Sequence, residues 1–160
     1  MPSKEALKPF QKIIVAYDDS LAARDALSVG IELCKLFGVP LQTVTVIEPP
    51  TAYTGLVLAI DPGIVQSLES DRRRSYEGLM EIAVAEGRLH SVDVTGHLVE
   101  AAEVDGIISF LRAERADLLV IGLQQHSFHV ARLWSTVASL EKKAPCSVLA
   151  VHAMPRKEKR

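Results

Sequence analysis

The chain has 160 residues, of which 48% are hydrophobic and 24% are charged, and its formal net charge at pH 7 is −2. This length fits one domain, and the apolar fraction is high enough for a full core, which excludes a globally disordered chain. The near balance of charges lacks the basic excess of a dedicated nucleic-acid binder, so we expect no nucleic-acid partner.

Three features predict a cytoplasmic location. The two cysteines, Cys34 and Cys146, are too few for a disulfide framework in a chain of this length. Residues 1–11 lack the apolar core of a signal peptide. No stretch approaches the ~18 consecutive apolar residues that a membrane span requires. We therefore expect a cytosolic protein that does not cross a membrane.

Strand and helix patterns alternate in the first half of the chain. Residues 12–17 (KIIVAY) form a β-branched run closed by Asp18-Asp19-Ser20, which is typical of a buried strand. A helix should follow, capped by Ser20 or Asp19 and stopped at Gly38. Its buried face is expected to hold Ala23, Leu27, Ile31 and Cys34.

The next elements are a strand over 41–47, an apolar loop over 48–62 and a long helix from about 63 to 87. The residues expected on the buried face of that helix are Ile64, Leu68, Leu79, Ile82 and Ala83. Arg72, Arg73 and Arg74 are expected to face solvent.

The second half continues the alternation. It predicts a strand over 92–99, a helix over about 103–115, a strand over 117–121, a helix over about 135–143 and a strand over 146–152. This order predicts a single α/β domain with a doubly wound, five-stranded parallel sheet and helices on both faces. We place an N-terminal extension at 1–11, the domain at 12–152 and a polar tail at 153–160.

Ligands of such sheets bind beyond the carboxyl ends of the strands, where the strand order reverses. The residues at those ends are Asp18-Asp19-Ser20, Val46-Ile47-Glu48, Glu100 and Gly122-Leu123-Gln124-Gln125. The first and fourth groups are the main candidates, because their strands would flank the switch point.

Two segments resemble the universal stress protein family, whose domain type is UspA-like. They are KIIVAYDDSLAARDAL (12–27) and ADLLVIGLQQHSFHVARLWSTVASLEKKAPCSVLAV (116–151). The resemblance implies the strand order 3-2-1-4-5, a stress-response role, frequent homodimers paired through the last strand, and a division into ATP-binding and non-binding members. It places the dimer interface at Ser147, Val148, Leu149, Ala150 and Val151.

The binding members carry Gly-x2-Gly-x9-Gly-Ser/Thr after the fourth strand. Gly122 matches the first glycine and Thr136 the hydroxyl position, whereas Gln125 and Ser135 stand where the family has glycines. By resemblance Asp18 would meet ribose, and Val46 would lie beside adenine. The full candidate set is Ala16, Tyr17, Asp18, Val46, Ile121, Gly122, Gln125, Ser135, Thr136 and Val137.

The two departures predict a degenerate nucleotide site. Glycine permits positive φ and a close approach of phosphate to the backbone, whereas a side chain there costs roughly 1–2 kcal/mol per residue. We therefore expect weak or no binding of ATP or AMP. The alternatives are a genuine ATP or AMP binder and a small-ligand pocket under the apolar loop at 51–60.

No catalytic constellation is evident, so we expect no enzyme activity and no metal site. His126 and His129 have an H-x2-H spacing without a nearby carboxylate or thiol to complete a metal site. Asp18-Asp19 is also similar to the acidic pair of receiver domains. The companion Asp and Lys of those domains are replaced by Glu100 and His152.

Overall fold

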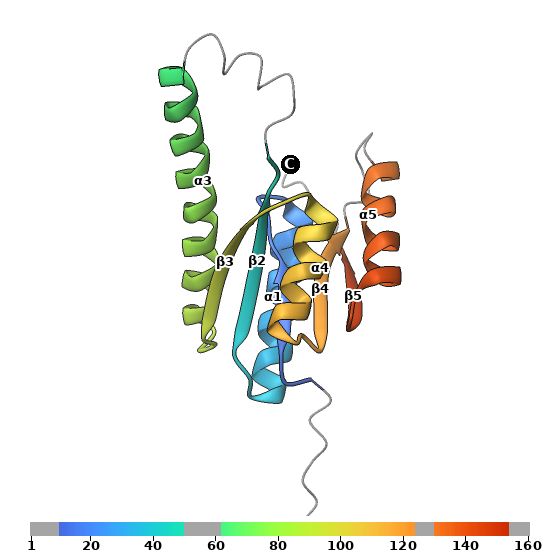
Figure 1. Ribbon diagram of the computed structural model, residues 1–160. Helices are drawn as coiled ribbons and strands as arrows, with labels where there is room; N and C mark the ends of the chain where they lie inside the picture. Colours follow the sequence, from blue (N-terminus) through green and yellow to red (C-terminus); the bar gives the residue numbers. More distant parts are fainter. Residues whose placement is uncertain (1–9, 50–61, 124–129, 154–160) are drawn as a thin grey trace, which may run out of the picture.

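The computed structural model describes residues 10–49, 62–123 and 130–153. They form a five-stranded parallel sheet in the order β3-β2-β1-β4-β5 (Figure 1). The elements are β1 (Ile13–Ala16), α1 (Leu21–Phe37), β2 (Leu41–Ile47), α3 (Pro62–Leu89), β3 (Val94–Glu100), α4 (Glu103–Glu114), β4 (Leu118–Leu123), α5 (Val130–Lys143) and β5 (Ser147–His152). The predicted fold class and strand order are confirmed.

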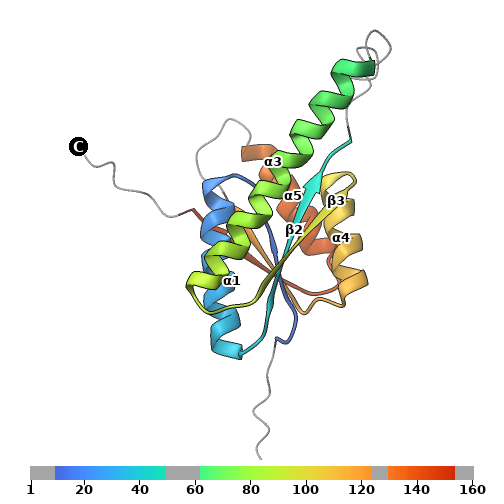
Figure 2. The same ribbon diagram turned by 90° about the vertical axis from the view of Figure 1, so that its left-hand side faces the viewer.

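Helices cover both faces of the sheet, and each face has its own core. Side chains of α1 and α3 pack with Ile13, Val15 and Val120 on one face. Side chains of α4 and α5 pack with Ile14, Val44 and other strand residues on the opposite face (Figure 2). The strands therefore lie between two helical layers, and the central strands β1 and β4 have almost continuous apolar sequence, as expected of a covered parallel sheet.

Helix α1 has the predicted ends and the predicted buried face. Ser20 Oγ accepts a hydrogen bond from the Ala23 backbone N–H at 3.1 Å, which caps the first turn. Gly38 ends the helix with φ +66°, a left-handed conformation that favours glycine. Ala23, Leu27, Ile31 and Cys34 are all buried.

Helix α3 is long, and its N-terminal half extends past the carboxyl ends of the strands (Figures 1 and 2). The prediction for its buried face was partly wrong. Ala83 is buried and Leu79 packs against the core, but Leu68 and Ile82 are 60% and 52% exposed. Their apolar side chains lie on parts of the helix surface that the sheet does not cover. The side chain of Ile64 lies outside the described residues.

Several boundaries differ from those predicted. Strand β3 begins at Val94 rather than at residue 92, and β4 continues through Gly122 to Leu123. Helix α5 begins at Val130, five residues earlier than predicted, so Ser135 and Thr136 lie within the helix and not at its start. His129, which directly precedes the helix, is not a preferred N-cap residue whereas Ser135 is, so the pattern predicted a later start.

Polar contacts close the amino end of the sheet. One Asp117 carboxylate oxygen accepts hydrogen bonds from the backbone N–H groups of Gln11 and Lys12, both at 2.8 Å. Glu114 accepts from Lys12 Nζ at 2.9 Å and from Gln42 Nε2 at 3.0 Å, and these bonds lower its pKa. Phe10 packs edge-on against Phe37 beside this end. The N-terminal segment from Phe10 onward is thus joined to the domain.

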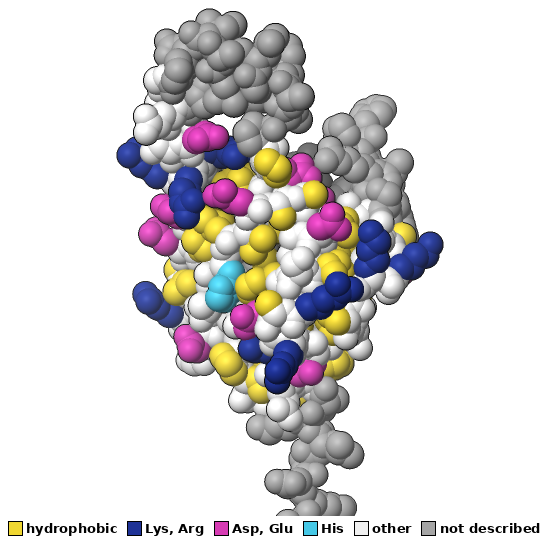
Figure 3. Space-filling view, in the orientation of Figure 1, with side chains coloured by type: hydrophobic (Ala, Val, Ile, Leu, Met, Phe, Trp, Pro, Cys, Tyr) yellow, Lys and Arg dark blue, Asp and Glu magenta, His cyan; other side chains and the backbone are white. Residues whose placement is uncertain are grey.

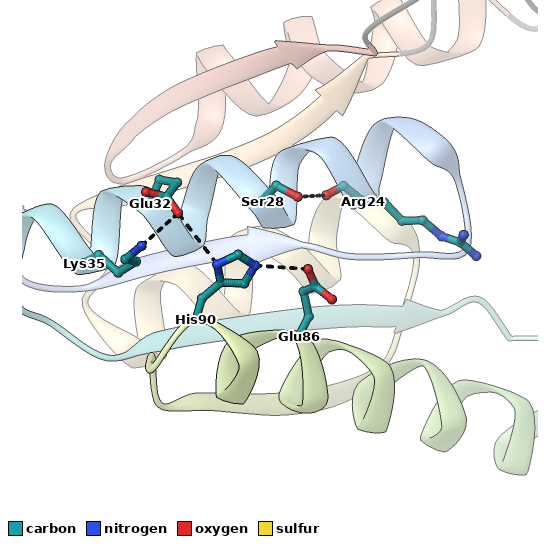
Figure 4. A network of polar contacts seen from close by, with 6 residues as sticks. All are labelled: Arg24, Ser28, Glu32, Lys35, Glu86 and His90. Carbon is teal, nitrogen blue, oxygen red and sulfur yellow. Dashed lines mark hydrogen bonds and ion pairs between the residues drawn. The ribbon is translucent and has the colours of Figure 1, made fainter. Parts of the chain in front are cut away.

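The same end carries a charged network between α1 and α3 (Figure 4). His90 lies between two carboxylates, with Nδ1 3.9 Å from Glu32 Oε1 and Nε2 3.4 Å from Glu86 Oε1. Lys35 also contacts Glu32, at 3.2 Å. These exposed contacts connect the C-terminal turns of the two helices.

Acidic and basic side chains are interspersed on the face shown in Figure 3. Among the described residues, no helix is long and apolar enough to span a membrane.

Candidate functional site

A cavity of about 660 Å³ opens at the carboxyl ends of the strands. It lies where β1 and β4 are neighbours but lead into helices on opposite faces of the sheet, α1 on one face and α5 on the other. This is the switch point at which doubly wound sheets place their ligands. The cavity is therefore a candidate binding site by position as well as by size.

Eight of the ten candidate residues line this cavity. They are Ala16, Tyr17, Asp18, Val46, Ile121, Gly122, Thr136 and Val137. They come from the ends of β1, β2 and β4 and from α5, which are far apart in the sequence. Gln125 and the side chain of Ser135 lie outside the described residues, as does the apolar loop at 51–60.

The end of β1 is held rigidly by its neighbour β2. The Tyr17 backbone N–H donates to the Val44 carbonyl at 2.9 Å, and the Thr45 hydroxyl donates to the Tyr17 carbonyl at 2.7 Å. Tyr17 is buried, and this burial raises its pKa. These bonds fix the direction in which the following residues enter the rim of the cavity.

Asp18 and Ser20 turn the chain from β1 into α1. The Asp18 carboxylate accepts from the Ser20 backbone N–H at 2.8 Å, while Ser20 Oγ caps the helix through Ala23. Asp18 is exposed and lines the cavity. It thus serves as a turn residue, and its position also allows contact with a ligand hydroxyl.

Gly122 is required by packing. A Cβ atom on this residue would lie 2.2 Å from the Ala22 carbonyl carbon and 2.6 Å from the Ala23 nitrogen. The first turn of α1 thus crosses β4 so closely that only glycine fits. Because packing alone explains Gly122, its match to the family motif is weak support for a phosphate-binding loop.

Helix α3 supplies a wall of the cavity that the sequence analysis missed. Its contribution is Arg72, Ser75, Tyr76 and Leu79. Arg72 Nη1 donates to the Glu48 carbonyl at 3.1 Å, so this arginine contacts the chain beyond β2 and is not wholly solvated. Arg73 and Arg74 do face solvent and make exposed ion pairs. The spacing 72, 75, 76 and 79 marks one helical face and could have revealed this wall.

The opposite wall is largely apolar. Val44, Val46, Ile107, Ile121 and Val137 contribute to it from β2, α4, β4 and α5. Thr136 and Val137 are buried there, on the second turn of α5. An apolar wall facing carboxylates and hydroxyls suits a small molecule with a flat apolar part and a polar part.

Other reactive groups lie away from the cavity. Cys34 is buried in the core, where desolvation raises its pKa to about 11. Burial also raises the pKa of Cys146, which precedes β5. The described residues contain no cluster of three or more His, Cys, Asp or Glu side chains that could hold a metal ion. His126 and His129 lie outside the described residues.

Solved structures with the same fold are numerous. A protein of the universal stress protein family from Burkholderia pseudomallei is 25% identical, with a TM-score of 0.65 over 89% of this chain and 96% of that one. The universal stress protein from Archaeoglobus fulgidus in complex with dAMP is 23% identical, with a TM-score of 0.59 over 89% and 98% of the two chains.

A universal stress protein family protein from Arabidopsis thaliana with AMP bound is 15% identical, with a TM-score of 0.63 over 89% of this chain and 92% of that one. At such identities the last two structures show the shared fold alone. No curated protein matches the chain in sequence.

The sequence profile of the Universal stress protein family matches residues 9–152, which is nearly the whole chain. That range includes all strands and helices of the structure and both segments on which the resemblance rested. The chain belongs to the universal stress protein family.

Proposed function

We propose that this protein is a stress-response binding module that holds an adenine-type ligand in the cavity at the carboxyl ends of the strands and holds phosphates weakly. The observation that carries the proposal is the convergence of eight candidate residues from four elements on one cavity. Two proteins of the same fold are complexes with dAMP and AMP, which supports an adenine ligand here. The replacement of two motif glycines by Gln125 and Ser135 supports weak phosphate binding.

Filling the cavity from its apolar wall tests this proposal. Val46→Phe should abolish AMP binding in a calorimetric titration, because the larger side chain occupies the space proposed for the base. Val99→Phe is the matched control, since Val99 pairs with Val46 in the β2–β3 register but does not line the cavity. Binding of AMP that survives Val46→Phe unchanged would place the site elsewhere.

We also propose that the module does not catalyse a reaction. The cavity lining has hydroxyls and carboxylates but no histidine or cysteine among its described residues, so it lacks the usual nucleophile–base pairs. Pure protein should hydrolyse ATP no faster than a buffer control, by a coupled phosphate-release assay. Turnover well above background that disappears in Asp18→Ala would overturn this part of the proposal.

Strand β5 is proposed as the homodimer interface. It pairs with β4 on one side only, so its other edge is open within the described chain. The backbone N–H groups of Ser147 and Ala153 donate toward β4. Since donors alternate along a strand, those of Val148 and Ala150 face the open edge, while that of Leu149 faces β4.

Because the backbone donors of β5 alternate, a test substitution must be made at a residue whose N–H faces the open edge. Ala150→Pro removes a donor from the open edge and should convert a dimer to a monomer in light scattering, with circular dichroism unchanged. Ala150→Ser keeps the donor and serves as the control. A folded Ala150→Pro variant that remains dimeric would exclude pairing through this edge.

A further inference from the structure

Half of the large apolar side chains that are exposed in the described chain belong to one helix. Leu68, Ile82 and Leu89 of α3 are 60%, 52% and 79% exposed. Their positions differ by multiples of seven residues, and Ser75, which is exposed and also borders the cavity, occupies the remaining position of this repeat. A seven-residue repeat keeps side chains on one line of a helix. We call these four residues the α3 row.

The α3 row is not part of the core. Ile82 and Leu89 lie on a different face of the helix from Leu79 and Ala83, which pack on the sheet side. Leu68 lies on the N-terminal half of the helix, which extends past the strands (Figure 2). At 1.5 Å per residue the row is about 32 Å long. An apolar line of this length on a helix surface is typical of a contact with a second helix.

Charged side chains beside the α3 row indicate which helix that is. Arg74 and Glu81 directly precede Ser75 and Ile82, so both lie on the same flank of the row. Both are exposed, and they carry opposite charges. Arg74 contacts Asp71 of its own helix at 3.6 Å, but such a pair of strongly exposed side chains contributes little. A helix that matches this flank must present an acidic and a basic group in the reverse order.

A second copy of α3 in antiparallel orientation presents these groups. When the contact is centred on the middle of the row, Arg74 of each copy lies near Glu81 of the other. Leu68 of each copy then lies near Leu89 of the other, and two-fold symmetry makes each contact twice. A parallel pair would instead bring Glu81 near Glu86 of the second copy, where like charges oppose each other.

We propose that α3 is a second homodimer surface, on which two copies pair their α3 rows in antiparallel orientation. This surface is separate from the proposed β5 contact, because α3 packs on β3 and β2, and β3 lies at the opposite edge of the sheet from β5. One copy can therefore use both surfaces, and contacts through α3 link β5 dimers into larger assemblies. A single pair of helices buries a small area, so the Kd of the α3 contact is on the order of 10–100 μM.

Sedimentation equilibrium of the full chain over a range of concentrations tests the proposal. The Ala150→Pro variant, in which β5 pairing is blocked, should still show a monomer–dimer equilibrium. Adding Ile82→Asp should abolish this equilibrium, because it places a carboxylate in the middle of the α3 row. Ile82→Leu keeps the row apolar and is the matched control. In the parent chain, Ile82→Asp should lower the mass measured at the highest concentrations, which gives a second test that does not depend on the proline variant.

An exchange of charges tests the antiparallel pairing. Arg74→Glu and Glu81→Arg should each weaken the association about tenfold, because each replaces two attractions by two repulsions. The double variant restores opposite charges and should regain the original association. Arg112→Glu makes a charge reversal on α4, on the other face of the sheet, and should have no effect.

Two results would overturn the second surface. One is an Ala150→Pro variant that stays monomeric up to about 1 mM. The other is an association that Ile82→Asp does not change. A double variant that fails to recover would overturn the antiparallel pairing of Arg74 with Glu81. A dimer that survives Ala150→Pro but not Ile82→Asp would support the α3 surface and exclude the β5 contact, so the two proposed interfaces are tested separately.

Discussion

The two ends of the sheet use charged residues differently. At the amino end, Asp117 accepts two backbone hydrogen bonds, and Glu114 accepts from Lys12 and Gln42. At the carboxyl end, Asp18 and Asp19 are exposed at the rim of a cavity that Glu48 and Glu103 also line. The carboxylates of Asp117 and Glu114 are bonded within the protein, whereas those at the carboxyl end line a space that can hold a ligand.

This difference separates stability from binding. Charged groups that satisfy backbone donors hold the chain together, and their loss leaves polar groups without partners. Exposed carboxylates at a rim contribute little to stability but set the electrostatic potential that a ligand meets. We therefore expect substitutions at the amino end to change folding and substitutions at the rim to change ligand choice.

The largest expected effect is on stability. It comes from Gly122, which lies at the carboxyl end of the sheet but has a packing role. Gly122→Ala places a Cβ 2.2 Å from the Ala22 carbonyl carbon, so α1 must move away from β4. We expect a loss of about 3 kcal/mol in the free energy of unfolding, measured by urea denaturation. Gly78→Ala is the control, because a Cβ there meets nothing within 4 Å in the middle of α3. It should stabilise the protein by about 0.5–1 kcal/mol. Equal effects of the two substitutions would refute the close-packing account of Gly122.

A direct contrast between the ends comes from two aspartates. Asp117→Ala removes the acceptor of two backbone N–H groups and should cost about 2 kcal/mol. Asp19→Ala removes an exposed carboxylate from the rim and should change stability by less than about 0.5 kcal/mol. Urea denaturation of both variants decides the matter, and a larger loss in Asp19→Ala would reverse the assignment of the two ends.

Alkaline pH tests the buried thiol near the amino end. Cys34 lies at the end of α1, and its pKa is raised from 9.0 to about 11 by desolvation. The unfolded thiol ionises first, so the unfolded state binds fewer protons between pH 9 and pH 11, and stability must fall as pH rises through this range. The expected loss from this group is about 2 kcal/mol.

Tyr17 and Cys146, whose pKa values are also raised, add to the same slope. The Cys34→Ala variant isolates the contribution of the core thiol. Its stability should decline less steeply between pH 9 and pH 11 than that of the parent protein. Identical slopes in the two proteins would show that Cys34 ionises normally in the fold.

The smallest effect is expected in the charged network of Figure 4. His90→Ala removes two contacts, to Glu32 and Glu86, that span 3.9 and 3.4 Å between partly exposed side chains. Such pairs contribute little, so the free energy of unfolding should change by less than about 0.5 kcal/mol. If thermal or urea denaturation shows a loss above about 1 kcal/mol in the free energy of unfolding, this network stabilises the amino end of the sheet and the prediction is wrong.

Local patterns predicted the elements that pack directly on the sheet. The apolar spacing of α1 identified its buried residues, and Ser20 and Gly38 marked its ends, because capping and periodicity depend on neighbours in sequence. The strand-end rule and the family resemblance together brought eight candidate residues to one cavity.

What the sequence did not show depends on distances between elements. Helix α3 extends past the sheet, and where it does cover the sheet only one of its faces packs on the core, so the apolar positions Leu68 and Ile82 are exposed. For the same reason Arg72 reaches the cavity although it belongs to a basic run that usually faces solvent. The packing role of Gly122 depends on the approach of α1 to β4, and no local pattern encodes that approach.

The central claim is that the carboxyl end binds and the amino end does not. Amide chemical-shift mapping by NMR during a titration with adenosine tests it most directly. We predict perturbations at Tyr17–Ser20, Val46 and Gly122, which border the cavity, and none at Asp93 or Asp117. Saturable perturbations confined to the amino end, or none at the cavity residues at millimolar adenosine, would contradict the account.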